Sequence, residues 1–81
     1  MKPTIGTIVM YNTSEKERNS LKYWGCNTPK QLPAIVTAIC DDACVNLRVI
    51  ADGLATHDFW AASIYNGNGE GEWNWGIPEK Q

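Results

Sequence analysis

Two runs of apolar and β-branched residues in the middle of the chain predict a β-hairpin. The first run, 34–40, carries apolar or small side chains on both faces, which is typical of a central strand. The second run, 45–50, alternates between apolar and polar positions, as a strand with one buried face does. Asp41 and Asp42 stand between the runs, where we expect their short side chains to bond nearby backbone amides in a turn.

Three further runs of the same character predict three more strands. They cover residues 6–11, 58–65 and 72–75, and each is followed by Asn or Gly. Five short strands at this spacing are typical of a small antiparallel barrel. We therefore expect a mainly β fold of the SH3-like or Tudor-like kind, and the 81 residues leave room for one such domain, 1–81.

The polar stretch between the first two strands carries the signals of a short helix. Ser14 and Glu17 have the spacing of a capping box, in which the serine hydroxyl accepts a backbone N–H bond and the glutamate reaches back. Gly25 stands where a left-handed residue ends a helix. The sequence thus predicts a helix over 15–24 within an insertion at about 14–25.

The aromatic residues are the strongest indication of function. Four tryptophans and three tyrosines exceed what the interior of so small a domain accommodates, so some should contact another molecule. The residues that we assign to the core are Val9, Val36, Leu47, Val49 and Trp60. The residues that we expect to bind a ligand or a partner are Tyr11, Trp24, Arg48, Tyr65, Trp73 and Trp75. One of the last two is open to a second interpretation, in which it plugs the end of the barrel.

Patterns for catalysis or metal binding have little support. His57 and Asp58 are neighbours in a strand and point to opposite faces, and nothing fixes a serine beside the histidine, so we predict no catalytic residue and no enzyme. Cys26, Cys40 and Cys44 nominally join His57 as four zinc ligands. One of the two closely spaced ligand pairs of a structural zinc site is missing, so we expect reduced thiols, no metal and no cofactor.

The charge distribution disfavours general nucleic-acid binding. The net charge is −2, with a balance of +3 over residues 1–30 and −5 over residues 31–81. Such polarity is able to guide self-association. The sequence has no apolar run long enough to cross a membrane and begins without an apolar secretory segment, so we expect the protein to stay in the cytoplasm.

Six short motifs occur in an order that resembles a group of short proteins from tailed bacteriophages and prophages. They are Gly6-x-Ile8-Val9-x-Tyr11, Pro33-Ala34-Ile35-Val36, Asn46-Leu47-x-Val49, Asp52-Gly53, Phe59-Trp60-Ala61-x-Ser63 and Gly71-x-Trp73-x-Trp75. The chain departs from the group at Gly76, where proline is usual, and at Met10, where histidine is common. The resemblance covers nearly the whole chain and implies expression inside a bacterium, but it carries no activity.

Three hypotheses follow from these patterns. The first is a non-enzymatic phage accessory protein, a homo-oligomer that binds a host factor or a small signalling ligand such as a nucleotide in the bacterial host cytoplasm, for host takeover or anti-defence. The second is a virion or assembly component, such as a head-decoration or connector subunit. The third is a nucleic-acid-binding barrel, which would need the basic insertion to act alone.

Overall fold

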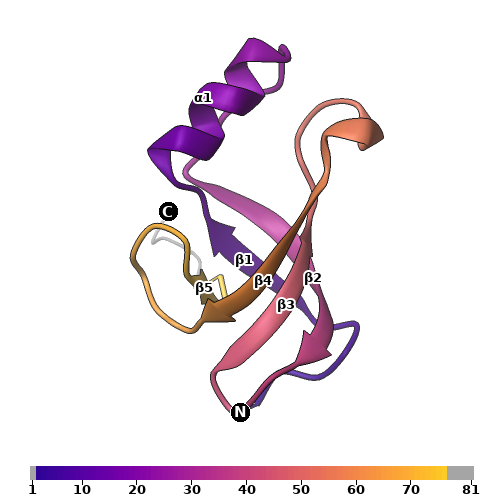
Figure 1. Ribbon diagram of the computed structural model, residues 1–81, viewed down its shortest axis with the longest axis vertical. Coiled ribbons are helices and arrows are strands. Elements are labelled where there is room, and N and C mark those ends of the chain that lie inside the picture. The colour runs from indigo at the N-terminus through magenta and orange to yellow at the C-terminus, as the bar shows by residue number, and fades with distance from the viewer. Residues whose placement is uncertain (1, 77–81) are drawn as a thin grey trace.

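The five predicted strands all form, and they build one antiparallel sheet that curls into a half-barrel (Figure 1). The computed structural model describes residues 2–76. The strand order is β4-β3-β2-β1-β5. The strands are β1 (Ile8–Asn12), β2 (Gln31–Ile39), β3 (Cys44–Val49), β4 (Phe59–Tyr65) and β5 (Trp73–Asn74). The expected mainly β fold with a helical insertion is therefore confirmed, and the strand ends differ from the predicted ones by a few residues.

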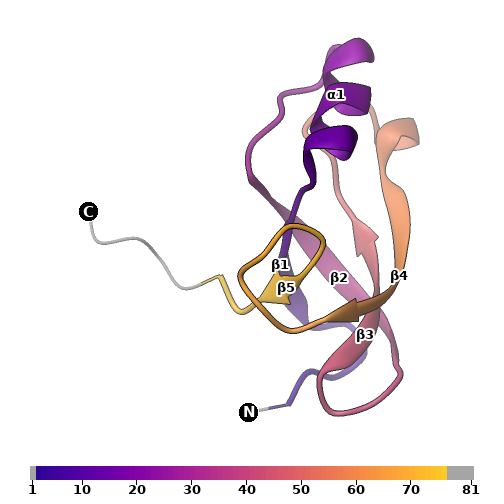
Figure 2. The ribbon, with the colours of Figure 1, turned by 60° about the vertical axis from the view of Figure 1, so that its left-hand side comes forward.

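Irregularities in the strand pairing accompany the curl of the sheet. The register shifts between Val36 and Ala38 in the β2–β3 pair and again in the β3–β4 pair, and such bulges increase the local twist. The β2–β3 turn forms as expected, because the Asp41 carboxylate accepts N–H bonds from Ala43 and Cys44 at 2.8 and 2.9 Å. Figure 2 shows this turn at the opposite end of the sheet from the helix.

The helix α1 (Glu15–Tyr23) fills the connection between β1 and β2 and has both predicted caps. The Glu17 N–H donates to the Ser14 hydroxyl at 3.2 Å, and the Ser14 N–H donates to the Glu17 carboxylate at 2.8 Å. Gly25 has a φ of 81° and ends the helix, while the next N–H, from Cys26, donates to the Leu21 carbonyl at 3.0 Å. Within residues 2–76, no helix is long and apolar enough to span a bilayer.

The concave face of the sheet holds the core. Its side chains alternate along each strand with outward-facing ones, as a sheet with one buried face requires. Leu21 of α1 also joins this core, so the helix is attached to the sheet by an apolar contact. Four of the five predicted core residues are buried there: Val9, Val36, Leu47 and Val49.

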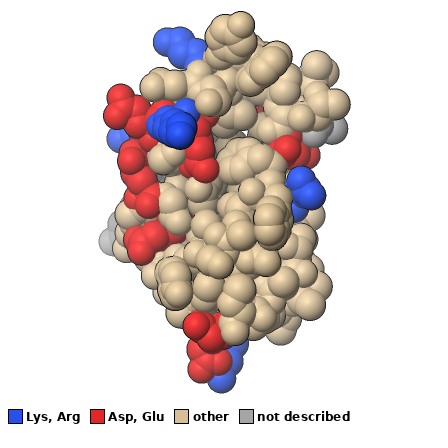
Figure 3. All heavy atoms as spheres, viewed as in Figure 1, with Lys and Arg blue, Asp and Glu red and all other residues tan. Residues whose placement is uncertain are grey.

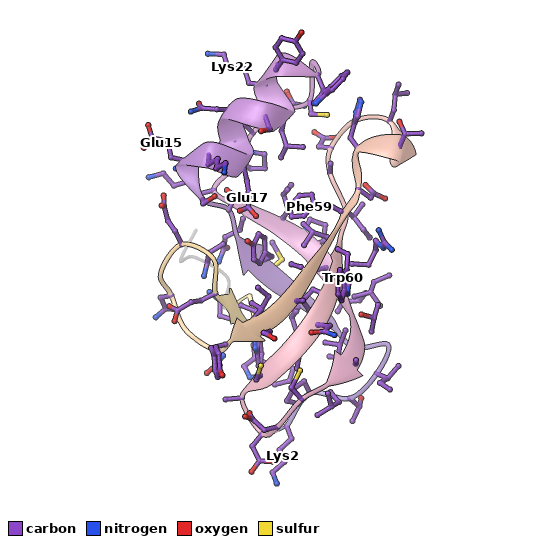
Figure 4. The ribbon with its side chains drawn as sticks, viewed as in Figure 1. Lys2, Glu15, Glu17, Lys22, Phe59 and Trp60 are labelled. Atoms are coloured by element: carbon purple, nitrogen blue, oxygen red, sulfur yellow. The ribbon has the colours of Figure 1, made fainter. Side chains whose placement is uncertain are left out.

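The assignment of Trp60 to the core is wrong, because its side chain lies on the outer face and is 60% exposed. The β3–β4 register pairs Phe59 with buried Val49, and it pairs Trp60 with exposed Arg48. Alternation along the strand then turns Phe59 inward and Trp60 outward, as Figure 4 shows. Both faces of β4 are similarly apolar, so its own pattern does not decide which face is buried.

Two residues expected to bind a ligand are core residues instead. Tyr11 and Trp73, which are paired across β1 and β5, are only 3% and 2% exposed. The Trp73 indole N–H donates to the Ala43 carbonyl at 2.9 Å. The Trp75 ring packs edge-on against the Trp73 ring, with 5.1 Å between the ring centroids. Trp73 is therefore the member of this pair that fills the interior, while Trp75 is partly exposed.

Candidate functional site

A groove of about 790 Å³ opens between α1 and the start of β4. Figure 4 shows Glu17 and Phe59 on its two sides, and Figure 3 shows charged side chains gathered on the α1 side. The second wall comes from β4 and from the 3₁₀ turn η1 (Ala55–His57), which precedes that strand. The groove is lined by Ser14, Lys16, Glu17, Ser20, Leu21, Trp24, Thr56, His57 and Phe59.

One end of the groove is organised around the Glu17 carboxylate. The Tyr11 hydroxyl donates to both Glu17 oxygens at 2.9 and 2.7 Å, and the Ser14 N–H donates to one of them. Burial, together with the Glu17 bond, raises the pKa of the Tyr11 phenol. Phe59 packs edge-on against Tyr11 with ring centroids 6.0 Å apart. Glu17 is therefore engaged in internal bonds, and exposed Lys16 is the one Lys or Arg among the residues that line the groove.

The other end of the groove is formed by two stacked rings. Trp24, the residue that caps the C-terminus of α1, lies 5.5 Å from the His57 ring with 30° between the ring planes. Trp24 is 61% exposed, so its indole is largely open to solvent. The Nδ1 atom of His57 also lies 3.2 Å from the Sγ atom of Cys26, a buried thiol. His57 thus contacts both the exposed Trp24 ring and the buried Cys26 thiol.

Contacts between two loops hold these rings together. The Asn27 side-chain amide donates to the Asp52 carboxylate at 2.6 Å, and the Asn27 N–H donates to the Asp52 carbonyl at 3.2 Å. A Cβ atom added to Gly53 would stand 2.5 Å from the Cys26 sulfur, so only glycine allows this close approach. The segment after α1 is thereby fixed against the connection that carries His57.

The residues expected to bind a partner do not form one site. Trp24 lines the groove, whereas Arg48 lies on the outer face beside Trp60. Tyr65 is 56% exposed near the β2–β3 turn, and the neighbouring Cys44 side chain raises the pKa of its phenol. The expected binding set is therefore distributed over separate parts of the surface and the core.

The nominal zinc ligands are also separated. Cys26 and His57 lie beside the end of α1, whereas Cys40 and Cys44 flank the β2–β3 turn at the opposite end of the sheet (Figure 1). No group of three or more His, Cys, Asp or Glu side chains with metal-binding geometry occurs in the part of the chain that the structure describes. The four residues do not assemble into a single tetrahedral site.

Three residues of the groove region were missed as functional residues at the sequence level. The sequence alone does not indicate Phe59 as a groove residue, and it suggests Cys26 and His57 only as nominal zinc ligands or, for His57, as a catalytic base. The Cys26–His57 contact joins positions 31 residues apart, so no local sequence pattern predicts this contact. Only the capping box, which places Ser14 and Glu17, was a usable local signal.

A second surface lies on the outer face of the sheet. The strand registers align Ile8, Ile35, Arg48 and Trp60 in one row across four strands. Ile8 is 57% exposed and Trp60 is 60% exposed. The row therefore presents apolar side chains to solvent around one cation, an arrangement found at protein interfaces.

Comparison with known proteins identifies no relative of this chain. The chain matches no protein-family model, no curated protein and no solved structure. The class that the fold and the groove define is thus a mainly β half-barrel with one helix beside an open groove.

Proposed function

We propose that this protein is a non-enzymatic accessory protein that binds a small ligand with a planar ring in the groove between α1 and β4. The observation that carries the proposal is the stack of exposed Trp24 on His57 at the mouth of the groove. An aromatic face left open beside an apolar cavity favours a further flat ring, because stacking removes both faces from water.

The groove also favours a ligand that combines this ring with a negative charge. Leu21 and Phe59 offer apolar contacts along its length, and Lys16 lies on the helix side. A nucleotide has this composition, with its base on the ring pair and its phosphate near Lys16. We assign the phosphate contact to Lys16 rather than to Arg48, because Arg48 projects from the outer face of the sheet.

The setting of this function rests on the sequence motifs. Their resemblance to phage and prophage proteins supports a role in the cytoplasm of an infected bacterium, with a host signalling nucleotide as the ligand. The curl of the five antiparallel strands supports an SH3-like or Tudor-like barrel.

Titration with the four ribonucleoside monophosphates tests the proposal. Backbone amide chemical shifts should change around Trp24 and His57, and Trp24→Ala should weaken binding about tenfold, since one base–aromatic stack contributes about 1–3 kcal/mol. Trp60→Ala is the matched control, because it removes an equally exposed indole outside the groove. The proposal fails if no monophosphate shifts the groove signals, or if the two variants weaken binding equally.

The outer-face row supports a second candidate function, a virion or assembly subunit. Ile8, Ile35 and Trp60 form an apolar strip, and burying it against a second copy of the chain would make a homo-oligomer. Mass spectrometry of purified virions would then detect many copies of the protein. If the protein is absent from purified virions, the virion function is excluded and the accessory function remains.

Nucleic-acid binding has less support. The basic residues of the insertion are interleaved with Glu15 and Glu17. The Arg18 guanidinium is bonded to the Glu70 carboxylate at 3.0 Å, so this cation is already paired. A duplex-binding surface needs several cations free to contact phosphates.

A further inference from the structure

The thiol of Cys26 and the imidazole of His57 form a close pair, and the proposed ring stacking in the groove makes no use of this thiol. Their Sγ and Nδ1 atoms are 3.2 Å apart, which is within hydrogen-bond distance for sulfur. A thiol becomes a strong nucleophile when a nearby base takes its proton, and histidine is the usual base in such pairs. His57 is the single histidine of the chain.

Both members of the pair are held in place by other contacts. The Cys26 N–H donates to the Leu21 carbonyl at 3.0 Å, and the Cys26 sulfur lies against Gly53. The His57 N–H donates to the Leu54 carbonyl at 2.9 Å, and Trp24 stacks on the His57 ring. The imidazole is thus held with Nδ1 toward the sulfur, and in the tautomer protonated at Nε2 this nitrogen accepts the thiol proton.

Within residues 2–76, the other two cysteines have no such base beside them. Cys40 is exposed, and its sulfur lies 3.7 Å from the side-chain oxygen of Asn46, which accepts no proton at neutral pH. Burial raises the pKa of the Cys44 thiol, which keeps it in its less reactive protonated form. The chain therefore contains an accessible thiol without a base and a buried thiol beside one.

We propose that Cys26, a buried thiol beside a residue of the groove wall, is a nucleophile activated by His57 that forms a covalent bond with a soft carbon electrophile. The thiol proton passes to Nδ1 of His57 while the sulfur electron pair forms the S–C bond. The leaving group departs with the electron pair of the bond that breaks, and the imidazolium then returns its proton to water. Each protein molecule reacts once, so this is covalent capture without turnover.

The groove defines what such an electrophile carries besides its reactive carbon. His57 is part of the groove wall, and Trp24 and Phe59 offer aromatic surface next to it. A flat apolar body stacked in the groove would place its reactive carbon beside His57, whose Nδ1 atom is 3.2 Å from the sulfur. The inference rests on the proposed groove for this preference, but the reactivity of the thiol itself does not depend on it.

Alkylation of the folded full-length chain with limiting iodoacetamide tests the thiol directly. Iodoacetamide carries no ring, so this assay is independent of nucleotide binding, and the bond that breaks is C–I with release of iodide. Trypsin places Cys26 in peptide 23–30 and the other two cysteines in peptide 31–48, where fragmentation separates them. The rate for each cysteine is then read by mass spectrometry.

Access and activation predict opposite results in this assay. Cys26 is only 7% exposed and Cys40 is exposed, so access alone makes Cys26 the slower thiol. Activation by His57 makes Cys26 roughly tenfold faster than Cys40, a modest part of what a positioned base contributes. The difference should disappear in denaturant, where both thiols meet only solvent.

The variant His57→Asn separates a base from a simple neighbour. Asparagine keeps a polar atom near the sulfur but accepts no proton, so the Cys26 rate should fall about tenfold while the Cys40 rate stays constant. The wild-type comparison decides the question even if this variant folds poorly. A Cys26 rate below that of Cys40, or a fast rate that His57→Asn does not change, would overturn the proposal.

Discussion

Replacing Trp73 with phenylalanine measures how much of the stability this ring supplies. The change leaves a cavity of about 40 Å³, which costs about 1 kcal/mol at roughly 24 cal/mol per Å³. It also removes the indole bond to the Ala43 carbonyl, a loss of about 1 kcal/mol. The carbonyl still accepts the Asn66 N–H at 3.0 Å, so no buried acceptor is orphaned. The expected cost is therefore about 2 kcal/mol, against a total of roughly 4–12 kcal/mol for a chain of this length.

Trp60→Phe is the matched substitution, because it removes the same indole from a side chain that is 60% exposed. We expect its cost to stay within about 0.5 kcal/mol, as for most surface changes. Equilibrium urea unfolding followed by circular dichroism gives both free energies of unfolding. If Trp73→Phe costs no more than Trp60→Phe, the division between buried and exposed tryptophans is wrong.

Two further predictions concern the groove. Burial and the Glu17 bond raise the pKa of the Tyr11 phenol. The folded protein therefore keeps a phenol proton that the unfolded chain loses near pH 10. The resulting contribution to the free energy of unfolding is complete below about pH 10 and declines above it. Tyr11→Phe should make the urea midpoint fall less steeply between about pH 10 and 12, and an unchanged slope would contradict this. Ser14→Ala should lower the free energy of unfolding by about 1 kcal/mol through loss of the capping box, whereas Ser20→Ala on the exposed helix surface should not. Equal melting temperatures for these two variants would refute the role of the cap.

Local signals account for what the sequence predicted well. The capping box and Gly25 lie within a dozen residues, and their effects depend on backbone bonds inside one short segment. The strands were predictable because β-branched runs are separated by turn residues. The Asp41 turn is equally local, since its carboxylate reaches amides two and three residues further on.

Long-range pairing explains what the sequence did not reveal. Which face of β4 is buried depends on Phe59 meeting Val49 in the neighbouring strand, and nothing within β4 indicates that register. The groove likewise requires the end of α1 to meet the connection before β4, through Asn27 and Asp52. Aromatic content predicted that some rings would be exposed, but their positions depended on these contacts.

The ends of the insertion lie on the same rung of the sheet. Asn12 and Gln31 are Cα partners in the β1–β2 pair, so the segment that carries α1 leaves and re-enters between adjacent strands. The segment between Asn12 and Gln31, which forms one wall of the groove, can therefore change in sequence while the β1–β2 pair keeps its register. Ligand preference and scaffold stability become separately adjustable properties, joined where Leu21 and Cys26 enter the core and where Glu17 bonds to Tyr11.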